Sequence, residues 1–162
     1  NLKDSTMKNA IQPFIKTSNI TEDISMFTTL DKTIILKGVN LFSGLTGEEV
    51  FQIAQIAEEE RYLAEEVIFQ EGDVGDSMFI IIDGSVSVYN QKKEITTLET
   101  GECFGEMALL DQEPRSSSIR TVTDTAVLKI DEESFYELVA SNIEIIQGIV
   151  KILSKRLRQS IA

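Results

Sequence analysis

The hydrophobic positions of the chain recur with two different periods, and the changes between them separate three regions. Residues 1–44 are mixed in pattern, but within them a set of apolar side chains recurs at helical spacing, namely Ile24, Phe27, Leu30, Ile34 and Ile35. Pro13 interrupts the start of this region. We expect one or two short helices here that dock on something larger.

A further helix is predicted from about 47 to 59. Thr46-Gly-Glu-Glu49 matches a capping box, in which the threonine hydroxyl and the glutamate carboxylate each accept a backbone amide of the other residue. An apolar stripe at helical spacing follows, formed by Val50, Ile53, Ala54, Ile56 and Ala57. The spacing indicates one buried helix face.

From 60 to 130 the period changes to two, which is typical of short strands. The apolar segments are Val67-Ile-Phe69, Met78 to Ile82, Val86 and Val88, Ile95 and Leu98, Ile119 to Val122, and Ala126 to Ile130. Asp83-Gly84 is typical of a hairpin. Glycine-containing turns with almost no helix between them predict a mainly β protein, an antiparallel β jelly-roll barrel with flanking helices. We expect its interior to include Ile80, Ile82, Val86 and Val88.

Two helices are predicted to end the chain. Asp131 can cap a helix that runs to about Ala140, and Ser141-Asn-Ile-Glu144 matches a second capping box. The last helix carries a stripe of Ile143, Ile146, Val150, Leu153 and Leu157, beside a second stripe of Ile145, Ile149 and Ile152. The first stripe would suit pairing with a second copy, and it would equally suit packing on the protein's own barrel.

Composition narrows the possible functions. The 162 residues include 15 basic and 27 acidic side chains, a net charge of −12, which argues against nucleic-acid binding by this chain alone. Histidine is absent, and the motifs of P-loop enzymes, α/β-hydrolases and zinc proteases are absent as well, so we expect no enzyme and no metal site. The single cysteine, Cys103, suits a reducing compartment, which predicts a cytoplasmic location, either of the protein or of this domain within a larger, membrane-bound one. No apolar run is long enough for a membrane span.

Between the strands, residues 101–119 carry the one pattern that suggests a ligand. Glu102, Glu106, Asp111 and Glu113 surround a single base, Arg115. Gly105 allows a close backbone approach, and the single helical turn predicted from Glu106 to Leu110 would present free amides to an anion. Arg115 could clamp a phosphate with two charge-assisted hydrogen bonds, and Ser116 could add a donor. Glu106 fits such a site if it faces a ligand hydroxyl. A cyclic nucleotide has both a phosphate and that hydroxyl.

The same residues carry a family resemblance. Phe104-Gly-Glu-Met-Ala-Leu-Leu110, followed by Pro114-Arg-Ser-Ser-Ser-Ile119, resembles the phosphate-binding cassette of cyclic-nucleotide-binding domains. That family includes the bacterial catabolite activator and the regulatory subunits of cyclic-AMP-dependent kinase. The resemblance runs from about Leu41 to Leu157, with its supporting glycines in place at Gly72, Gly75, Gly84, Gly101 and Gly105.

The resemblance implies a role for each cassette residue. Glu106 would accept the ribose 2′-hydroxyl, and Arg115 would pair with the cyclic phosphate. The remaining ligand-binding positions would be Phe104 and Gly105, which shape the turn, the backbone amides of Met107 and Ala108, and the hydroxyl residues Ser116 and Ser117. Ser116 is compatible with either purine, and we favour cyclic AMP over cyclic GMP.

The resemblance also implies a sensor within a larger polypeptide. Because the first residue is Asn1 and no signal segment follows, we expect a piece of a longer protein or one processed at its N-terminus. Residues 1–40 would link to the remainder, and 41–162 would form the nucleotide-binding domain, with the barrel at about 60–130 and its C-terminal helices at about 131–160. Those helices would relay the signal through a hinge near Ala140-Ser141. No DNA-recognition helix is visible.

Two other interpretations remain, one for the cassette and one for an acidic turn that precedes it. In the first, the barrel no longer binds nucleotide and serves as an assembly module, although the presence of both Glu106 and Arg115 argues against that loss. In the second, the acidic turn from Glu71 to Asp76 binds calcium. That turn lacks the twelve-residue loop with its terminal bidentate glutamate, so we expect a solvated turn.

Overall fold

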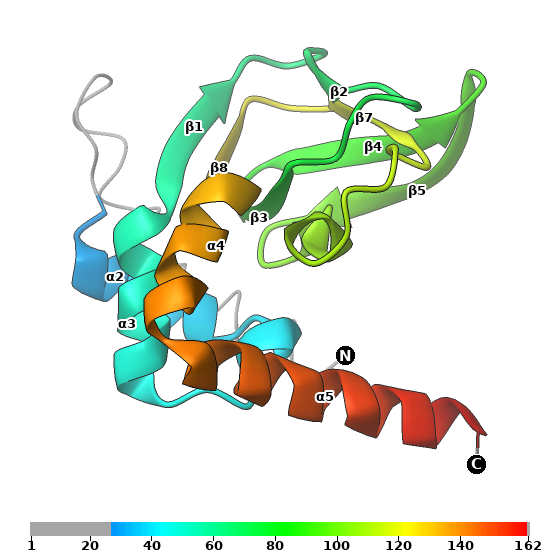
Figure 1. Ribbon diagram of the computed structural model, residues 1–162. Helices are drawn as coiled ribbons and strands as arrows, with labels where there is room; N and C mark the ends of the chain where they lie inside the picture. Colours follow the sequence, from blue (N-terminus) through cyan, green and yellow to red (C-terminus); the bar gives the residue numbers. More distant parts are fainter. Residues whose placement is uncertain (1–26, 162) are drawn as a thin grey trace. The chain divides into compact units, whose positions relative to one another are not determined.

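The computed structural model describes residues 27–161, which form two compact units. One unit is a β barrel made of residues 57–132, and the other consists of the helices in 27–56 and 133–161. Figure 1 shows the strands and helices of each unit. Ile24 and Pro13, on which part of the helical prediction rests, lie outside the described residues. Within residues 27–161, no helix combines the length and the apolarity that crossing a bilayer requires.

The barrel consists of two antiparallel four-stranded sheets, which confirms the predicted jelly-roll class. The first sheet has the order β1-β8-β3-β6, and the second has the order β2-β7-β4-β5. The strands are β1 (Glu58–Tyr62), β2 (Val67–Phe69), β3 (Ser77–Asp83), β4 (Ser85–Asn90), β5 (Lys93–Glu99), β6 (Cys103–Phe104), β7 (Ser118–Thr121) and β8 (Thr125–Asp131). One short 3-10 helix, η2 (Glu106–Leu109), stands where a single helical turn was predicted.

The interior of the barrel corrects one prediction about β3. The buried cluster contains Phe79, Ile81, Val86, Phe104, Ile119 and Val127, with Val88 and Leu98 packed against it. Val86 and Val88 therefore face this interior as expected, whereas Ile80 and Ile82 lie on the opposite face of β3 and are buried there. Because β3 is buried along both faces, alternation of polar and apolar residues could not indicate which face points inward.

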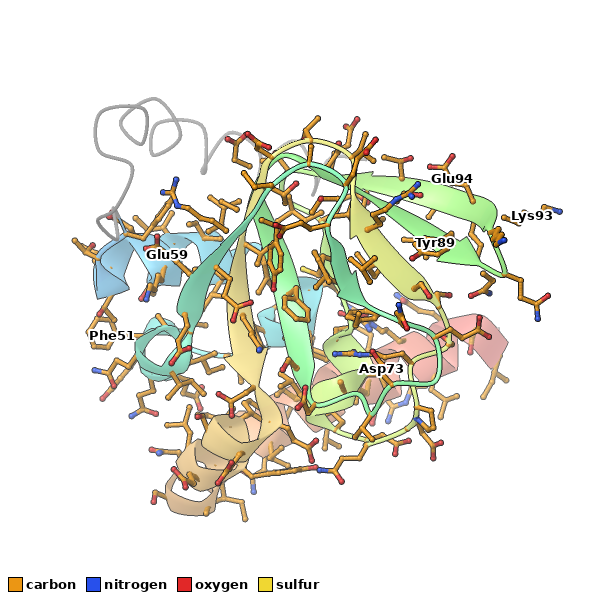
Figure 2. All side chains as sticks on the ribbon, turned by 90° about the horizontal axis from the view of Figure 1, so that it is seen from above. Phe51, Glu59, Asp73, Tyr89, Lys93 and Glu94 are labelled. Atoms are coloured by element: carbon orange, nitrogen blue, oxygen red, sulfur yellow. The ribbon has the colours of Figure 1, made fainter. Side chains whose placement is uncertain are left out.

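The predicted hairpin at Asp83-Gly84 is wrong. β3 pairs with β8 and β6, and β4 pairs with β5 and β7, so Gly84 marks a corner where the chain passes from one sheet to the other. Its φ of 109° and the closeness of Asp124 leave no room for a side chain. The hairpin of this region joins β4 to β5 instead, with Lys93 near its tip and Tyr89 and Glu94 on its two strands (Figure 2).

The helical unit begins with α2 (Thr29–Lys37), the 3-10 turn η1 (Asn40–Phe42) and α3 (Gly47–Ile56). The capping box at Thr46 is confirmed, because the Glu49 amide donates to the Thr46 hydroxyl and the Thr46 amide donates to the Glu49 carboxylate, at 3.2 and 2.9 Å. α3 ends three residues before the predicted boundary at 59. Glu58 already pairs with Lys129 of β8, so the residues from Glu58 onward form strand β1 and cannot continue the helix.

The unit ends with α4 (Glu132–Ser141) and α5 (Ile143–Ile161). The predicted capping box at Ser141 is wrong, because Ser141 is the last residue of α4 and Asn142 occupies the break. The Asn142 side chain donates to the Leu138 carbonyl (3.0 Å), and its own carbonyl accepts the Ile145 amide (3.1 Å). The break therefore lies within two residues of the predicted hinge.

Of the two apolar stripes on α5, the second is the buried one. Ile145 and Ile149 are fully buried, and Gly148 between them lies against Gly44 and Leu45. The first stripe remains largely open, with Ile143, Val150 and Leu157 between 52% and 63% exposed. The docked face of α5 is thus distinct from an apolar face that points to solvent.

Candidate ligand-binding site

A pocket of about 590 Å³ opens in the barrel beside η2. Its lining includes every residue predicted to bind a ligand, namely Phe104, Gly105, Glu106, Met107, Ala108, Arg115, Ser116 and Ser117. The structure thus brings the two halves of the cassette together around one space, although six residues separate Ala108 from Arg115 in the sequence.

The turn between β6 and η2 is built around Gly105. Its φ of 71° lies in the left-handed region, which a side chain disfavours. A Cβ at this position would also lie 2.6 Å from Nη1 of Arg115 and 2.9 Å from the Ser77 carbonyl oxygen. The missing side chain therefore lets the cassette backbone approach the arginine closely.

The backbone of Arg115 is held by the acidic turn between β2 and β3. The Arg115 amide donates to the Asp73 carbonyl (2.7 Å), and the Gly72 amide donates to the Arg115 carbonyl (2.8 Å). The turn is itself closed by a bond from the Gln70 amide to the Asp73 carboxylate (2.9 Å). This turn was predicted to be only a solvated loop, and the structure shows that it also fixes the position of Arg115.

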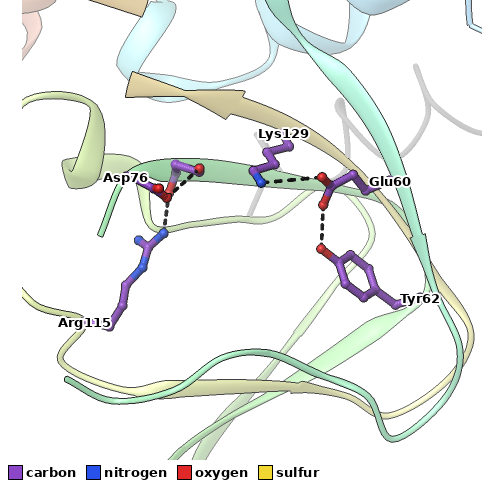
Figure 3. A network of polar contacts seen from close by, with 6 residues as sticks. Glu60, Tyr62, Asp76, Arg115 and Lys129 are labelled. Atoms are coloured by element: carbon purple, nitrogen blue, oxygen red, sulfur yellow. Dashed lines mark hydrogen bonds and ion pairs between the residues drawn. The ribbon is translucent and has the colours of Figure 1, made fainter. Parts of the chain in front are cut away.

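A hydrogen bond and an aromatic ring hold the Arg115 guanidinium. Nη2 donates to the Ser77 carbonyl at 2.7 Å, and Cζ lies 4.0 Å from the centroid of the Phe69 ring. Nε is buried and has no hydrogen-bond partner in the described part of the chain. Figure 3 shows the guanidinium beside Asp76. Arginine has five N–H donors, so the guanidinium can bind a ligand in addition to the Ser77 carbonyl.

The electrostatics of Arg115 differ in one respect from the sequence prediction. Burial lowers the pKa of the Arg115 guanidinium, and the carboxylates of Asp76 and then Asp73 oppose that shift. The prediction had placed Glu102, Glu106, Asp111 and Glu113 around the arginine because they are near in sequence. The acids with the largest effect come instead from the β2–β3 turn, since the fold brings that turn against the cassette.

One backbone donor of the cassette is already in use. The Ala108 amide donates to the Gly105 carbonyl at 3.0 Å, as expected in a 3-10 turn. Ala108 was predicted to offer this amide to the phosphate. In the structure a ligand would have to share that donor or replace the Gly105 carbonyl as its acceptor.

Several pocket residues were not predicted. Phe69, Leu98, Asp111, Glu113 and Pro114 also line the space, together with Val88 and Ile119 of the interior faces of β4 and β7. The apolar members could have been suspected from strand alternation, which places them on the interior face. No sequence pattern predicts the contact between Phe69 and Arg115, because the two residues are 46 positions apart.

A second polar group lies at the edge of the barrel, outside the pocket lining. The Tyr62 hydroxyl donates to Glu60 at 2.5 Å, and the same carboxylate lies 3.5 Å from Nζ of Lys129 (Figure 3). Burial raises the pKa of the Tyr62 phenol, and the Glu60 carboxylate raises it further. The phenol therefore stays protonated and donates to the Glu60 carboxylate, which also pairs with Lys129 of β8.

The geometry of the pocket suits a small amphipathic anion. Arg115 supplies the positive charge, and Glu106 is a carboxylate on the opposite half of the cassette that can accept a hydroxyl. Val88, Leu98 and Ile119 add an apolar wall. Such a pocket can hold a phosphate and a sugar at the cassette and a flat apolar group beyond them.

Comparison with known proteins agrees with this geometry. Residues 59–142 match the family model of the cyclic nucleotide-binding domain. A cyclic AMP receptor protein from Thermus thermophilus is 32% identical over 130 residues, which are 77% of this chain and 60% of that protein. A cGMP-dependent protein kinase from Caenorhabditis briggsae is 34% identical over 111 residues, 64% of this chain and 15% of the kinase.

A solved structure shares the fold. PKAR CBD2 with bound Sp-2Cl-cAMPS has a TM-score of 0.58 and is 29% identical, covering 82% of this chain and 94% of its own. The curated relatives are longer, and this chain spans 60% or less of the two described above.

Proposed function

The chain belongs to the cyclic nucleotide-binding domain family, and on that premise we propose that it senses a cyclic nucleotide, with cyclic AMP favoured over cyclic GMP. The observation that carries this proposal is the pocket that unites Arg115 and Glu106. An acidic chain has little reason to hold a half-buried arginine in the wall of a pocket unless an anion completes the site.

In the proposed complex, the phosphate binds the Arg115 guanidinium and the ribose 2′-hydroxyl donates to Glu106. The base then lies toward the apolar wall of Val88, Leu98 and Ile119. This assignment uses the polar and apolar sides of the pocket for the matching parts of the ligand. It also accounts for a carboxylate beside an anion site, because Glu106 faces a donor and not the phosphate.

The preference for cyclic AMP rests on the relatives and on the residue that follows Arg115. The relative with the larger matched segment is a cyclic AMP receptor protein, whereas another relative is a cGMP-dependent kinase. In this chain Ser116 follows Arg115, and a threonine at that position is the residue associated with cyclic GMP in some members of the family. These observations together favour cyclic AMP.

We further propose that the signal reaches a larger polypeptide through the C-terminal helices. Two neighbouring carbonyls support this route. The Ser77 carbonyl accepts Arg115, and the Asp76 carbonyl accepts the amide of Glu132, the first residue of α4, at 2.7 Å. When a phosphate draws Arg115 toward it, the hydrogen bond to Ser77 pulls on the start of β3 at Asp76-Ser77. Because the first residue of α4 is bonded to Asp76, a movement of this segment also displaces the N-terminus of α4. The ligand shifts the helix arrangement to the extent that it binds one arrangement more tightly.

The proposed role is recognition without catalysis. The pocket holds one arginine, carboxylates and serine hydroxyls, and the chain has no histidine to activate a nucleophile. Its residues are suited to hold a cyclic phosphate in place.

Calorimetric titration of the purified chain with cyclic AMP, cyclic GMP and 5′-AMP tests the proposal. We expect binding of both cyclic nucleotides, tighter binding of cyclic AMP, and much weaker binding of 5′-AMP, whose phosphate carries more charge and is not tied to the 3′-oxygen. Absence of binding by either cyclic nucleotide would favour the assembly-module interpretation. Tighter binding of cyclic GMP would reverse only the base preference.

A further inference from the structure

Phe69 is an aromatic residue whose ring lies directly against the arginine of the pocket. Cζ of Arg115 is 4.0 Å from the ring centroid, well inside the distance at which a cation and an aromatic face attract each other. Phe69 also lines the pocket. The ring is therefore placed to act on the guanidinium and on the space where a phosphate would bind.

The Phe69 ring is itself held by other aromatic side chains. Its centroid lies 6.1 Å from that of Phe79 and 5.9 Å from that of Phe104, and Phe79 and Phe104 stack at 4.9 Å. These distances are within the range of favourable aromatic pairs. The face that Phe69 presents to Arg115 is thus fixed by the core of the barrel and does not depend on a mobile surface side chain.

Two contacts together determine the plane of the guanidinium. The Phe69 ring covers one face, and the Ser77 carbonyl accepts Nη2 at 2.7 Å. On a third side, the missing side chain of Gly105 leaves room beside Nη1. Nε is enclosed by protein, so a phosphate would approach the terminal Nη groups, and recognition of a phosphate by arginine depends on the direction of such donors.

We propose that Phe69 is a positioning residue for the phosphate-binding arginine. Its ring holds the Arg115 guanidinium in the orientation that presents it to the cyclic phosphate, so that less side-chain freedom is lost on binding. The inference rests on the proposed function, because it requires Arg115 to contact the ligand phosphate. It adds a residue on β2, remote in sequence from the cassette, to those that set affinity.

The test compares Phe69→Leu with two matched variants in the full chain. Leucine keeps an apolar side chain but removes the aromatic face, so cyclic AMP should bind about three- to thirtyfold more weakly, which corresponds to the roughly 0.5 to 2 kcal/mol of such contacts. Phe69→Tyr retains the face and should bind within about threefold of the parent. Phe42→Leu removes a buried ring of η1, outside the pocket lining and outside this aromatic cluster, and it should change affinity by less than about threefold.

A double-variant cycle separates positioning from direct contact with the ligand. In an Arg115→Ala background, Phe69→Leu should change the affinity for cyclic AMP by less than about twofold, measured by nuclear magnetic resonance titration at millimolar ligand. An equal loss in both backgrounds would show that Phe69 touches the ligand or supports the fold, and it would overturn the inference. Unfolding in urea confirms that each variant is folded.

The remaining outcomes are also decisive. A parent chain that binds cyclic AMP with a Phe69→Leu variant of equal affinity overturns this inference and leaves the proposed function standing. A parent chain that binds neither cyclic AMP nor cyclic GMP overturns both. If Phe69→Tyr keeps the affinity for cyclic AMP and Phe69→Leu loses it, the result supports the role of the aromatic face.

Discussion

Arg115 is the residue on which the proposed function depends most. Its replacement by alanine removes the positive charge opposite a phosphate and leaves Asp76 and Asp73 facing that phosphate without compensation. We expect Arg115→Ala to weaken cyclic AMP binding by about 2–5 kcal/mol, measured by calorimetry.

The matched control for this variant is Arg120→Ala. Arg120 is an exposed arginine on β7 that does not line the pocket, so its loss should leave binding nearly unchanged. If Arg115→Ala bound cyclic AMP as tightly as the parent chain does, the assignment of the phosphate site would be wrong.

Glu106 is expected to determine recognition of the ribose. A hydrogen bond from the 2′-hydroxyl to a carboxylate is worth about 1.5–3 kcal/mol, so the parent should prefer cyclic AMP over its 2′-deoxy analogue by roughly ten- to a hundredfold. Glu106→Ala should reduce that preference to nearly one. Glu113→Ala, which removes another carboxylate of the same pocket, should keep it. If the ratio is unchanged in Glu106→Ala, the ribose role belongs to a different residue.

The cassette could be predicted from the sequence because its residues lie close together in the chain. Gly105, Glu106 and Arg115 fall within eleven positions, and each has a chemical role that its type suggests. Phe69, Asp73 and Asp76 could not be assigned in this way. They reach the site only through pairing of β2 with β7 and through the turn that follows β2, which are long-range consequences of the fold.

Among the elements, β3 and β4 show where a period-two pattern loses information. A strand buried on both faces gives no alternation, so the inward residues Phe79 and Ile81 could not be distinguished from Ile80. The corner at Gly84 resembles a hairpin because both require a positive φ. Only the pairing of β3 and β4 with different sheets separates the two cases.

The corner gives a prediction about stability. A Cβ on Gly84 would lie 2.6 Å from the Asp124 carbonyl oxygen, in addition to the strain of its φ of 109°. We expect Gly84→Ala to lower the free energy of unfolding by roughly 2–4 kcal/mol, measured by urea denaturation. Gly72 has a φ of 89° but nothing within 4 Å of its would-be Cβ, so Gly72→Ala should cost only about 1 kcal/mol. Equal losses would mean that crowding at the corner is relieved elsewhere.

The open stripe of α5 supports a prediction about assembly. Ile143, Val150 and Leu157 recur every seven residues and are more than half exposed, the spacing of a helix that pairs with a second copy. If α5 self-associates, light scattering should show a dimer for the parent chain and a monomer for a Val150→Glu, Leu157→Glu variant. Gln147→Glu adds charge at an exposed position outside the stripe and should leave the dimer intact. A monomeric parent at high concentration would contradict this pairing.

At the scale of the whole molecule, two electrostatic effects on an anion oppose each other. The net charge of −12 repels the anion at long range, whereas Arg115 attracts it within the site. Charge on the entire surface acts over the Debye length, which is about 30 Å at 0.01 M salt and about 8 Å at 0.15 M. Arg115 acts on a phosphate in contact with it, where screening is weak. The acidic surface therefore slows the approach of every anion, and the pocket retains the small one that fits.

This division predicts an unusual dependence of binding kinetics on salt. Cyclic AMP is an anion approaching a strongly acidic protein, so raising the salt concentration from 0.01 to 0.15 M should increase its association rate about two- to fivefold, because screening removes the repulsion. Stopped-flow fluorescence with a labelled cyclic AMP measures this rate. A positively charged binding surface would give the opposite slope. A rate that falls with salt would therefore show that the local field of Arg115 dominates the approach as well as the bound state.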